Sequence, residues 1–151
     1  MPVLRNTAMV EQVAMNDRVT GFVLKQSDYR EADVIVTILT KEYGKLSFVA
    51  QGVRKMTSKN AGSIMPYTKT EILFDYNETK TIFRLKNARC KDYYRSMHED
   101  ITASSAAAVA AELIDVLTLQ ANSDMPNSIE YALLDIVFSK LDEGYDPTLV
   151  L

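Results

Sequence analysis

The chain has 151 residues, 47% of them hydrophobic and 25% charged, with a formal net charge of −3. This composition is typical of one globular domain, or of a small domain with part of a second. No stretch approaches the roughly 18 charge-free apolar residues of a membrane helix. The single cysteine, Cys90, excludes an internal disulfide and a zinc site built from cysteines alone, and it fits a reducing compartment.

The net charge conceals a strong asymmetry along the chain. Residues 41–95 hold twelve Lys and Arg against five Asp and Glu, whereas residues 101–151 hold one Lys and eight Asp and Glu. A positive module joined to an acidic, apolar one predicts a polyanion-binding surface beside an element that docks a protein or completes the core.

Residues 1–17 are predicted to be a leader. Arg5 and Glu11 interrupt the apolar positions, so the segment lacks the apolar core of about 7–15 residues that a secretory signal needs. We interpret it as unstructured, or as an upstream start with Met15 as the natural first residue. The alternative is a short amphipathic helix built on Val3, Val10, Val13 and Ala14.

Residues 18–95 are predicted to form a β domain. Five segments are rich in β-branched and aromatic residues or alternate apolar with polar side chains, as strands do: 18–25, 33–40, 45–51, 67–76 and 80–89. Gly21, inside the first segment, indicates a bulge or a close backbone approach, and Gly44 supplies a positive φ in a hairpin turn. Five such strands predict a closed or nearly closed OB-like barrel in an α+β protein.

The last predicted strand concentrates cations on one face. Because side chains alternate along a strand, the residues on that face are Lys80, Ile82, Arg84 and Lys86. Burying three charges there would be very costly, so the face is expected to be solvated or to hold an anion. With Lys45 on a possibly neighbouring strand, the row would form a shallow positive track for a phosphate backbone.

Residues 96–151 are predicted to begin a helical domain. The spacing from Ser96 to Glu99 is that of a capping box, and a helix is expected over about 99–120. A second helix is expected to begin after Asn127 and to stop at Gly144. The pair Asp146-Pro147 is typical of the cap and first turn of a third helix.

The two longer predicted helices are apolar on more than one face. The expected core-facing stripes are Ala106, Val109, Ala110, Leu113 and Leu117 in the first, and Ile129, Leu133, Ile136, Val137 and Leu141 in the second. Further apolar residues lie off these stripes: Ile114, Val116, Leu119, Leu134 and Phe138. The short third helix cannot cover them. We therefore expect a truncated helical domain, the front part of a longer protein, or an oligomer that covers the surface.

The sequence gives little support to catalysis. The only histidine, His98, lies in the capping sequence, and Glu99 and Asp100 are adjacent, so they diverge on a helix. Cys90 lies between two cations but has no credible histidine partner, and no phosphate-binding loop or zinc motif is present. We therefore expect a protein that is not an enzyme and that has no cofactor and no metal site.

Nucleic-acid binding fits the residues better. The basic segment, residues 53–63, offers Arg54, Lys55 and Lys59 among small, flexible residues, and phosphates attract such side chains. Bases stack on aromatic rings, and the β domain contains Tyr29, Tyr43, Phe48, Tyr67, Tyr76 and Tyr93. The cluster of cations favours anion binding over a merely solvated surface.

A series of short motifs resembles the opening of the RecO family of bacterial recombination mediators. The motifs are TGFVL at 20–24, DYREAD at 28–33, LTKEYGK at 39–45, QGVRK at 51–55, MPY at 65–67 and ILF at 72–74. The resemblance covers about residues 18–151. Segment 52–59 matches the family's basic segment, although Met56 and Thr57 stand where many relatives carry further Arg or Pro. The Cys-rich zinc segment of many relatives is missing, so no metal is assigned.

The resemblance implies an OB-fold domain over 18–95 and the start of a helical domain over 96–151. It also implies a bacterial cytoplasmic, nucleoid-associated protein that binds and anneals single- and double-stranded DNA. Its implied partners are RecR and the single-stranded DNA-binding protein, with which it would help to load RecA during recombinational repair. The acidic helical half supports an alternative, an OB-like protein-interaction scaffold without direct DNA binding.

Overall fold

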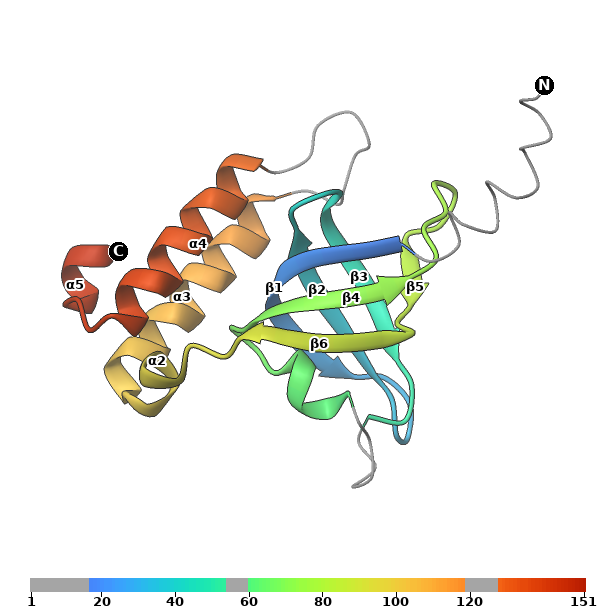
Figure 1. Ribbon diagram of the computed structural model, residues 1–151, viewed down its shortest axis with the longest axis horizontal. Helices are drawn as coiled ribbons and strands as arrows, with labels where there is room; N and C mark the ends of the chain where they lie inside the picture. Colours follow the sequence, from blue (N-terminus) through green and yellow to red (C-terminus); the bar gives the residue numbers. More distant parts are fainter. Residues whose placement is uncertain (1–16, 54–59, 119–127) are drawn as a thin grey trace.

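The computed structural model describes residues 17–53, 60–118 and 128–151 of the chain. Figure 1 shows a curled β-sheet with helices packed along one side of it. The sheet is built from β1 (Asp17–Asp28), β2 (Val34–Thr40), β3 (Gly44–Ala50), β4 (Lys69–Phe74), β5 (Ile82–Arg84) and β6 (Asn87–Asp92), with a 3₁₀ turn, η1 (Ala61–Ile64), before β4.

The six strands form one sheet in the order β5-β3-β2-β1-β4-β6. Neighbours pair antiparallel except β3 and β5, which run parallel with Val49 opposite Arg84. The α+β class is thus observed, but the sheet is not closed, and the expected five-stranded barrel is not confirmed.

The single strand expected over 80–89 is wrong, because the structure divides it into β5 and β6. The backbone N–H of Leu85 donates to Val49 O (3.0 Å), and that of Lys86 donates to Leu73 O (2.9 Å). Within two residues the chain therefore changes its hydrogen-bonding partner from β3 to β4, and this ends β5 and begins β6 on the opposite edge of the sheet.

The inner face of the sheet holds the main core. Leu46, Phe48 and Ala50 on β3 point into it, as their alternation with polar residues predicts. The rings of Phe48, Phe74 and Phe83 pack edge to face or tilted, with centroids 5.0–6.1 Å apart.

The close approach expected at Gly21 is confirmed. A Cβ placed there would lie 2.5 Å from Ile38 Cγ2 and 2.6 Å from the backbone oxygen of Leu39 on the neighbouring strand. Only glycine lets the strands come this close without displacing backbone. The irregularity in the β1–β2 register lies slightly further on, between Val23 and Lys25.

The helical layer contains α2 (Arg95–Glu99), α3 (Ile101–Leu117), α4 (Ser128–Asp142) and α5 (Pro147–Val150). The capping box at Ser96 is wrong, because α3 begins at Ile101 and Asp100 caps it by accepting from the N–H groups of Thr102 and Ala103. The third helix begins as expected, with Asp146 accepting from the N–H of Thr148 and proline in the first turn. Gly144 follows α4 with φ 94°.

The predicted core-facing stripes of α3 and α4 are largely wrong. The buried residues of α3 are five alanines, and α4 buries Leu134, Phe138 and Leu141. These side chains pack on Phe22, Leu24 and Leu39, which point outward from β1 and β2. Small alanines let α3 approach the sheet and α4 closely, so the larger residues expected to be buried face outward instead: Val109, Leu113, Leu117, Ile129, Leu133 and Ile136.

Candidate nucleic-acid interface

The helical layer decides which part of the sheet remains open. Because α3 and α4 pack on the outer face of β1 and β2, a nucleic acid cannot lie there. The end of β3, together with β5 and β6, lies outside this cover (Figure 1).

Lys45 belongs to the covered part. Its Nζ donates to Asp115 Oδ1 (3.1 Å) and to the backbone oxygens of Asp115 (2.9 Å) and Thr118 (2.6 Å), and its side chain is only 12% exposed. Lys45 thus neutralises the carbonyls at the C-terminal end of α3 and ties that helix to β3. The role expected for it in a positive track conflicts with this position, because its ammonium is directed at the helix.

Asp115 is held between two cations, since Lys25 Nζ also lies 3.1 Å from its other carboxylate oxygen. Burial raises the pKa of Asp115, but the hydrogen bonds from Lys25 and Lys45 outweigh burial and place the pKa below its usual value. The folded protein therefore favours the ionised carboxylate.

We expect Asp115→Asn to destabilise the protein by about 2 kcal/mol at pH 7, because charge-assisted bonds to Lys45 are lost. The folded-state pKa is lowered, so this contribution is full above the ordinary value of about 4 and disappears as the pH falls through the folded-state value. Urea unfolding at pH 7 and at low pH measures both effects. Glu99→Gln, which breaks only the exposed pair with Arg95, is the control. If Asp115→Asn and Glu99→Gln lost equal free energy of unfolding at pH 7, the stabilising role assigned to Asp115 would be contradicted.

Arg84 and Lys86 belong to a short stretch, residues 84–88, that contacts the chain before and after residues 54–59. Arg84 pairs in register with Val49 near the end of β3, four residues before Val53. After residue 59, Asn60 Oδ1 accepts from the N–H of Ala88 (3.2 Å), two residues beyond Lys86. Two described residues that flank the stretch 54–59 in the sequence, Val49 and Asn60, therefore contact residues 84–88.

The remaining predicted site residues fall into two groups. Arg54, Lys55 and Lys59 lie outside the described residues. Lys80 is exposed in the turn before β5, four residues before Arg84. Lys86 is exposed and forms an ion pair with Asp75 (Nζ–Oδ1 2.8 Å), a surface contact of low energy that a phosphate can replace.

Sequence reasoning missed the cations of β6. Arg89 and Lys91 are exposed on this edge strand, and Arg89 shares Glu71 with Arg18 at 3.3 and 3.4 Å. Both belong to the cation-rich region 41–95. They were not assigned to a site because β6 was not recognised as a separate strand.

The aromatic side chains proposed for base stacking differ in their accessibility. Phe48 is completely buried, and Tyr43 and Tyr76 stack on each other against the core with centroids 4.3 Å apart. Burial, followed by the charge of Asp17, raises the pKa of Tyr43. Tyr29 is exposed with the Arg30 guanidinium over its ring, Tyr67 is half-buried, and Tyr93 is exposed.

In the described part of the chain, no helix is long and apolar enough to cross a membrane. Within residues 17–53, 60–118 and 128–151, no three His, Cys, Asp or Glu side chains are grouped so that they could hold a metal ion.

The fold and these positions define a class: a small α+β protein with a cation-bearing open end on a curled sheet. The family model described as "Recombination protein O N terminal" matches residues 15–94, more than half of the chain, and the chain belongs to this family.

Curated relatives carry the name DNA repair protein RecO. The chain is 30% identical to that of Listeria welshimeri over 89% of its own length and 51% of the relative's. It is 32% identical to that of Bacillus velezensis over 86% and 49%, and 34% identical to that of Leuconostoc mesenteroides over 87% and 50%. The chain therefore spans about half the length of these relatives.

Proposed function

We propose that the chain is the DNA-binding part of a recombination mediator. The observation that carries the proposal is that residues 84–88, which include the cations Arg84 and Lys86, contact Val49 and Asn60, in a member of a DNA-repair family. In the sequence, Val49 and Asn60 flank the cations of residues 54–59. The cations Arg54, Lys55, Lys59, Arg84 and Lys86 would follow the phosphate backbone, while Lys45 serves the fold.

The binding would be electrostatic and independent of base sequence. None of the described helices at this end of the sheet can enter a groove, because α3 and α4 lie on the covered outer face of β1 and β2. Phosphate contacts of this kind fit both single and double strands, and annealing requires a protein that accepts both.

The wider role follows the family. The protein would act in the bacterial cytoplasm, near the nucleoid, by binding rather than by catalysis. RecR and the single-stranded DNA-binding protein would be its partners, and loading of the recombinase on coated single strands would be the outcome.

Charge reversal at Arg84 and Lys86 tests the proposed interface. Arg84→Glu/Lys86→Glu is expected to weaken binding to a single-stranded oligonucleotide at least about 10-fold at low salt, since two phosphate contacts become repulsive. Fluorescence anisotropy measures the affinity, and circular dichroism checks the fold.

The matched control is Lys41→Glu/Lys140→Glu. These residues lie away from residues 84–88, and Lys140 also pairs with an acid, Glu143. An unchanged affinity in the Arg84/Lys86 variant, with the fold intact, would show that this row is only solvated surface.

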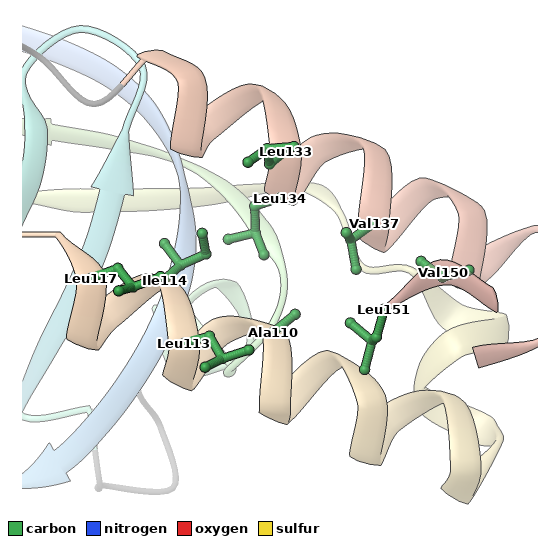
Figure 2. Close-up of a pocket in the computed structure, with 9 residues that line it drawn as sticks. All are labelled: Ala110, Leu113, Ile114, Leu117, Leu133, Leu134, Val137, Val150 and Leu151. Carbon is green, nitrogen blue, oxygen red and sulfur yellow. The ribbon is translucent and has the colours of Figure 1, made fainter. Parts of the chain in front are cut away.

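A specific observation favours the second candidate, a protein-interaction scaffold. An apolar hollow of about 270 Å³ lies between α3, α4 and the end of α5. Figure 2 shows the side chains that line it: Ala110, Leu113, Ile114, Leu117, Leu133, Leu134, Val137, Val150 and Leu151. Several of them are exposed, so the expected apolar excess of these helices is present.

The hollow leads to a prediction that separates the two functions. The chain is expected to self-associate or to bind a hydrophobic dye, and Leu113→Glu/Leu133→Glu should reduce either signal several-fold by charging the hollow. DNA affinity should stay unchanged, because the hollow lies on the helical layer. Dye fluorescence, sedimentation and anisotropy make the comparison. A monomer that binds no dye would contradict the prediction, and a parallel loss of DNA binding would favour a shared surface.

A further inference from the structure

A stack of three rings lies where the sheet meets the helical layer. His98 is the middle ring: its centroid is 6.5 Å from that of Tyr67 and 4.7 Å from that of Tyr93, with interplanar angles of 27° and 19°. Tyr67 is half-buried, whereas Tyr93 is 43% exposed. The stack therefore presents its outermost ring, Tyr93, to solvent.

The middle of the stack is held on both sides. His98 Nδ1 lies 3.1 Å from the backbone oxygen of Tyr94, and Nε2 lies 3.0 Å from that of Pro66. These two contacts fix the plane of the imidazole between α2 and the segment before β4. A ring that stacks on such a fixed plane loses little further freedom when a ligand packs on it.

The backbone is unusual on both sides of the stack. Tyr67 and Tyr94 are the non-glycine residues with positive φ in the described chain, at 63° and 54°. Such conformations are costly and persist where the surroundings enforce them. At Tyr94 the turn sends its own ring into the helical core, edge to face with Phe138, while the preceding ring of Tyr93 stays outside. Two adjacent tyrosines therefore lie in opposite environments, Tyr94 in the helical core and Tyr93 at the surface.

Cations flank the exposed ring in the sequence. Lys91 and Arg95 stand two residues before and two residues after Tyr93, and both are exposed. Tyr93 follows β6 directly, and β6, whose Ala88 N–H donates to Asn60 Oδ1, leads into α2 (Figure 1). Arg95 also pairs with Glu99 (2.8 Å), an exposed contact of low energy. An exposed aromatic ring with cations close to it in the sequence suits a base together with its neighbouring phosphates.

We infer that Tyr93 is a stacking platform for one unpaired base of a single-stranded nucleic acid, backed by His98 and Tyr67. This inference rests on the proposed DNA binding and adds to it a contact with a base rather than a phosphate. A base within a duplex is stacked on its neighbours and does not present its face, so the platform favours single strands over double strands.

The test compares an oligothymidine of about 15 nucleotides, near the upper end of the range that one OB fold binds, with an abasic oligonucleotide of the same length. Tyr93→Ala is expected to lower affinity for oligothymidine about 5- to 100-fold, the range for one base–aromatic stack. Its affinity for the abasic strand should not change. Tyr93→Phe should retain both affinities, because it keeps the ring. Tyr145→Ala, at another exposed tyrosine beyond α4, is the matched control.

Each possible result either supports or overturns the proposed stacking at Tyr93. The platform is supported if Tyr93→Ala loses affinity for oligothymidine alone while its melting curve matches that of the wild type, and if Tyr93→Phe keeps the wild-type affinities. Equal losses on both strands, or no loss on either, overturn it while leaving the proposed DNA binding in place. A wild-type protein that binds neither strand at low salt overturns the proposed function as well.

Discussion

Replacing Arg54, Lys55 and Lys59 together by alanine is expected to weaken single-stranded DNA binding about 100-fold at 0.1 M salt. Each phosphate contact on a single strand contributes about 0.7 to the slope of log affinity against log salt, so three lost contacts should flatten that slope by about 2. Unrelated base sequences should lose affinity equally, since phosphates carry no sequence information. Anisotropy titrations with two unrelated oligonucleotides at several salt concentrations measure all three effects.

The control for this variant removes charge elsewhere. Lys41→Ala/Lys140→Ala changes one exposed and one half-buried cation away from residues 84–88, and it should alter the slope far less. An unchanged slope in the triple variant would remove the basic segment from the interface and leave Arg84 and Lys86 to account for binding.

Phe74→Ala is expected to cause the largest loss of stability, about 3–5 kcal/mol. Phe74 is completely buried, and the centroid of its ring lies 5.0 Å from that of Phe48 and 5.1 Å from that of Phe83. Truncation therefore leaves a cavity at the centre of the inner core. A domain of this size is stable by only about 5–15 kcal/mol, and the variant should be near its unfolding midpoint under mild conditions. Urea unfolding followed by circular dichroism measures the loss.

Ile82→Ala is the matched control for the core prediction. Ile82 is the neighbour of Phe83 on β5 but faces solvent, so its truncation should cost no more than about 0.5 kcal/mol. Similar losses in the two variants would contradict the division of β5 into an inner and an outer face.

The sheet was largely predictable because strand signals are local. The alternation on β3, the positive φ of Gly44 and the close approach at Gly21 all follow from short stretches of sequence. The separation of β5 from β6 was not predictable, since it depends on hydrogen bonds from Leu85 and Lys86 to β3 and β4. No local pattern distinguishes such a transfer from a continuous strand.

The buried faces of α3 and α4 could not be predicted from hydropathy. Hydropathy selects large apolar residues as the buried stripe, but α3 buries alanines because close packing against the sheet and α4 requires small side chains. The larger residues predicted for the core are mostly exposed instead, and three of them, Leu113, Leu117 and Leu133, line the hollow between α3, α4 and α5.

The candidate site was predictable in charge but not in position. Region 41–95 contains the cations, yet nothing local indicates that Lys45 is directed at the end of α3, or that residues 84–88 contact Val49 and Asn60. Both depend on contacts between residues far apart in the chain. The stack at Tyr93 likewise needs Tyr67 and His98, which the fold brings together.

The most direct test of the account is a binding isotherm of this chain on single-stranded DNA at 50 and 200 mM salt. Five phosphate contacts, from the three cations of the basic segment with Arg84 and Lys86, predict a fall in affinity of about 100-fold between the two conditions. Binding that is absent at 50 mM salt, or that does not change between the two concentrations, would contradict an electrostatic DNA-binding function.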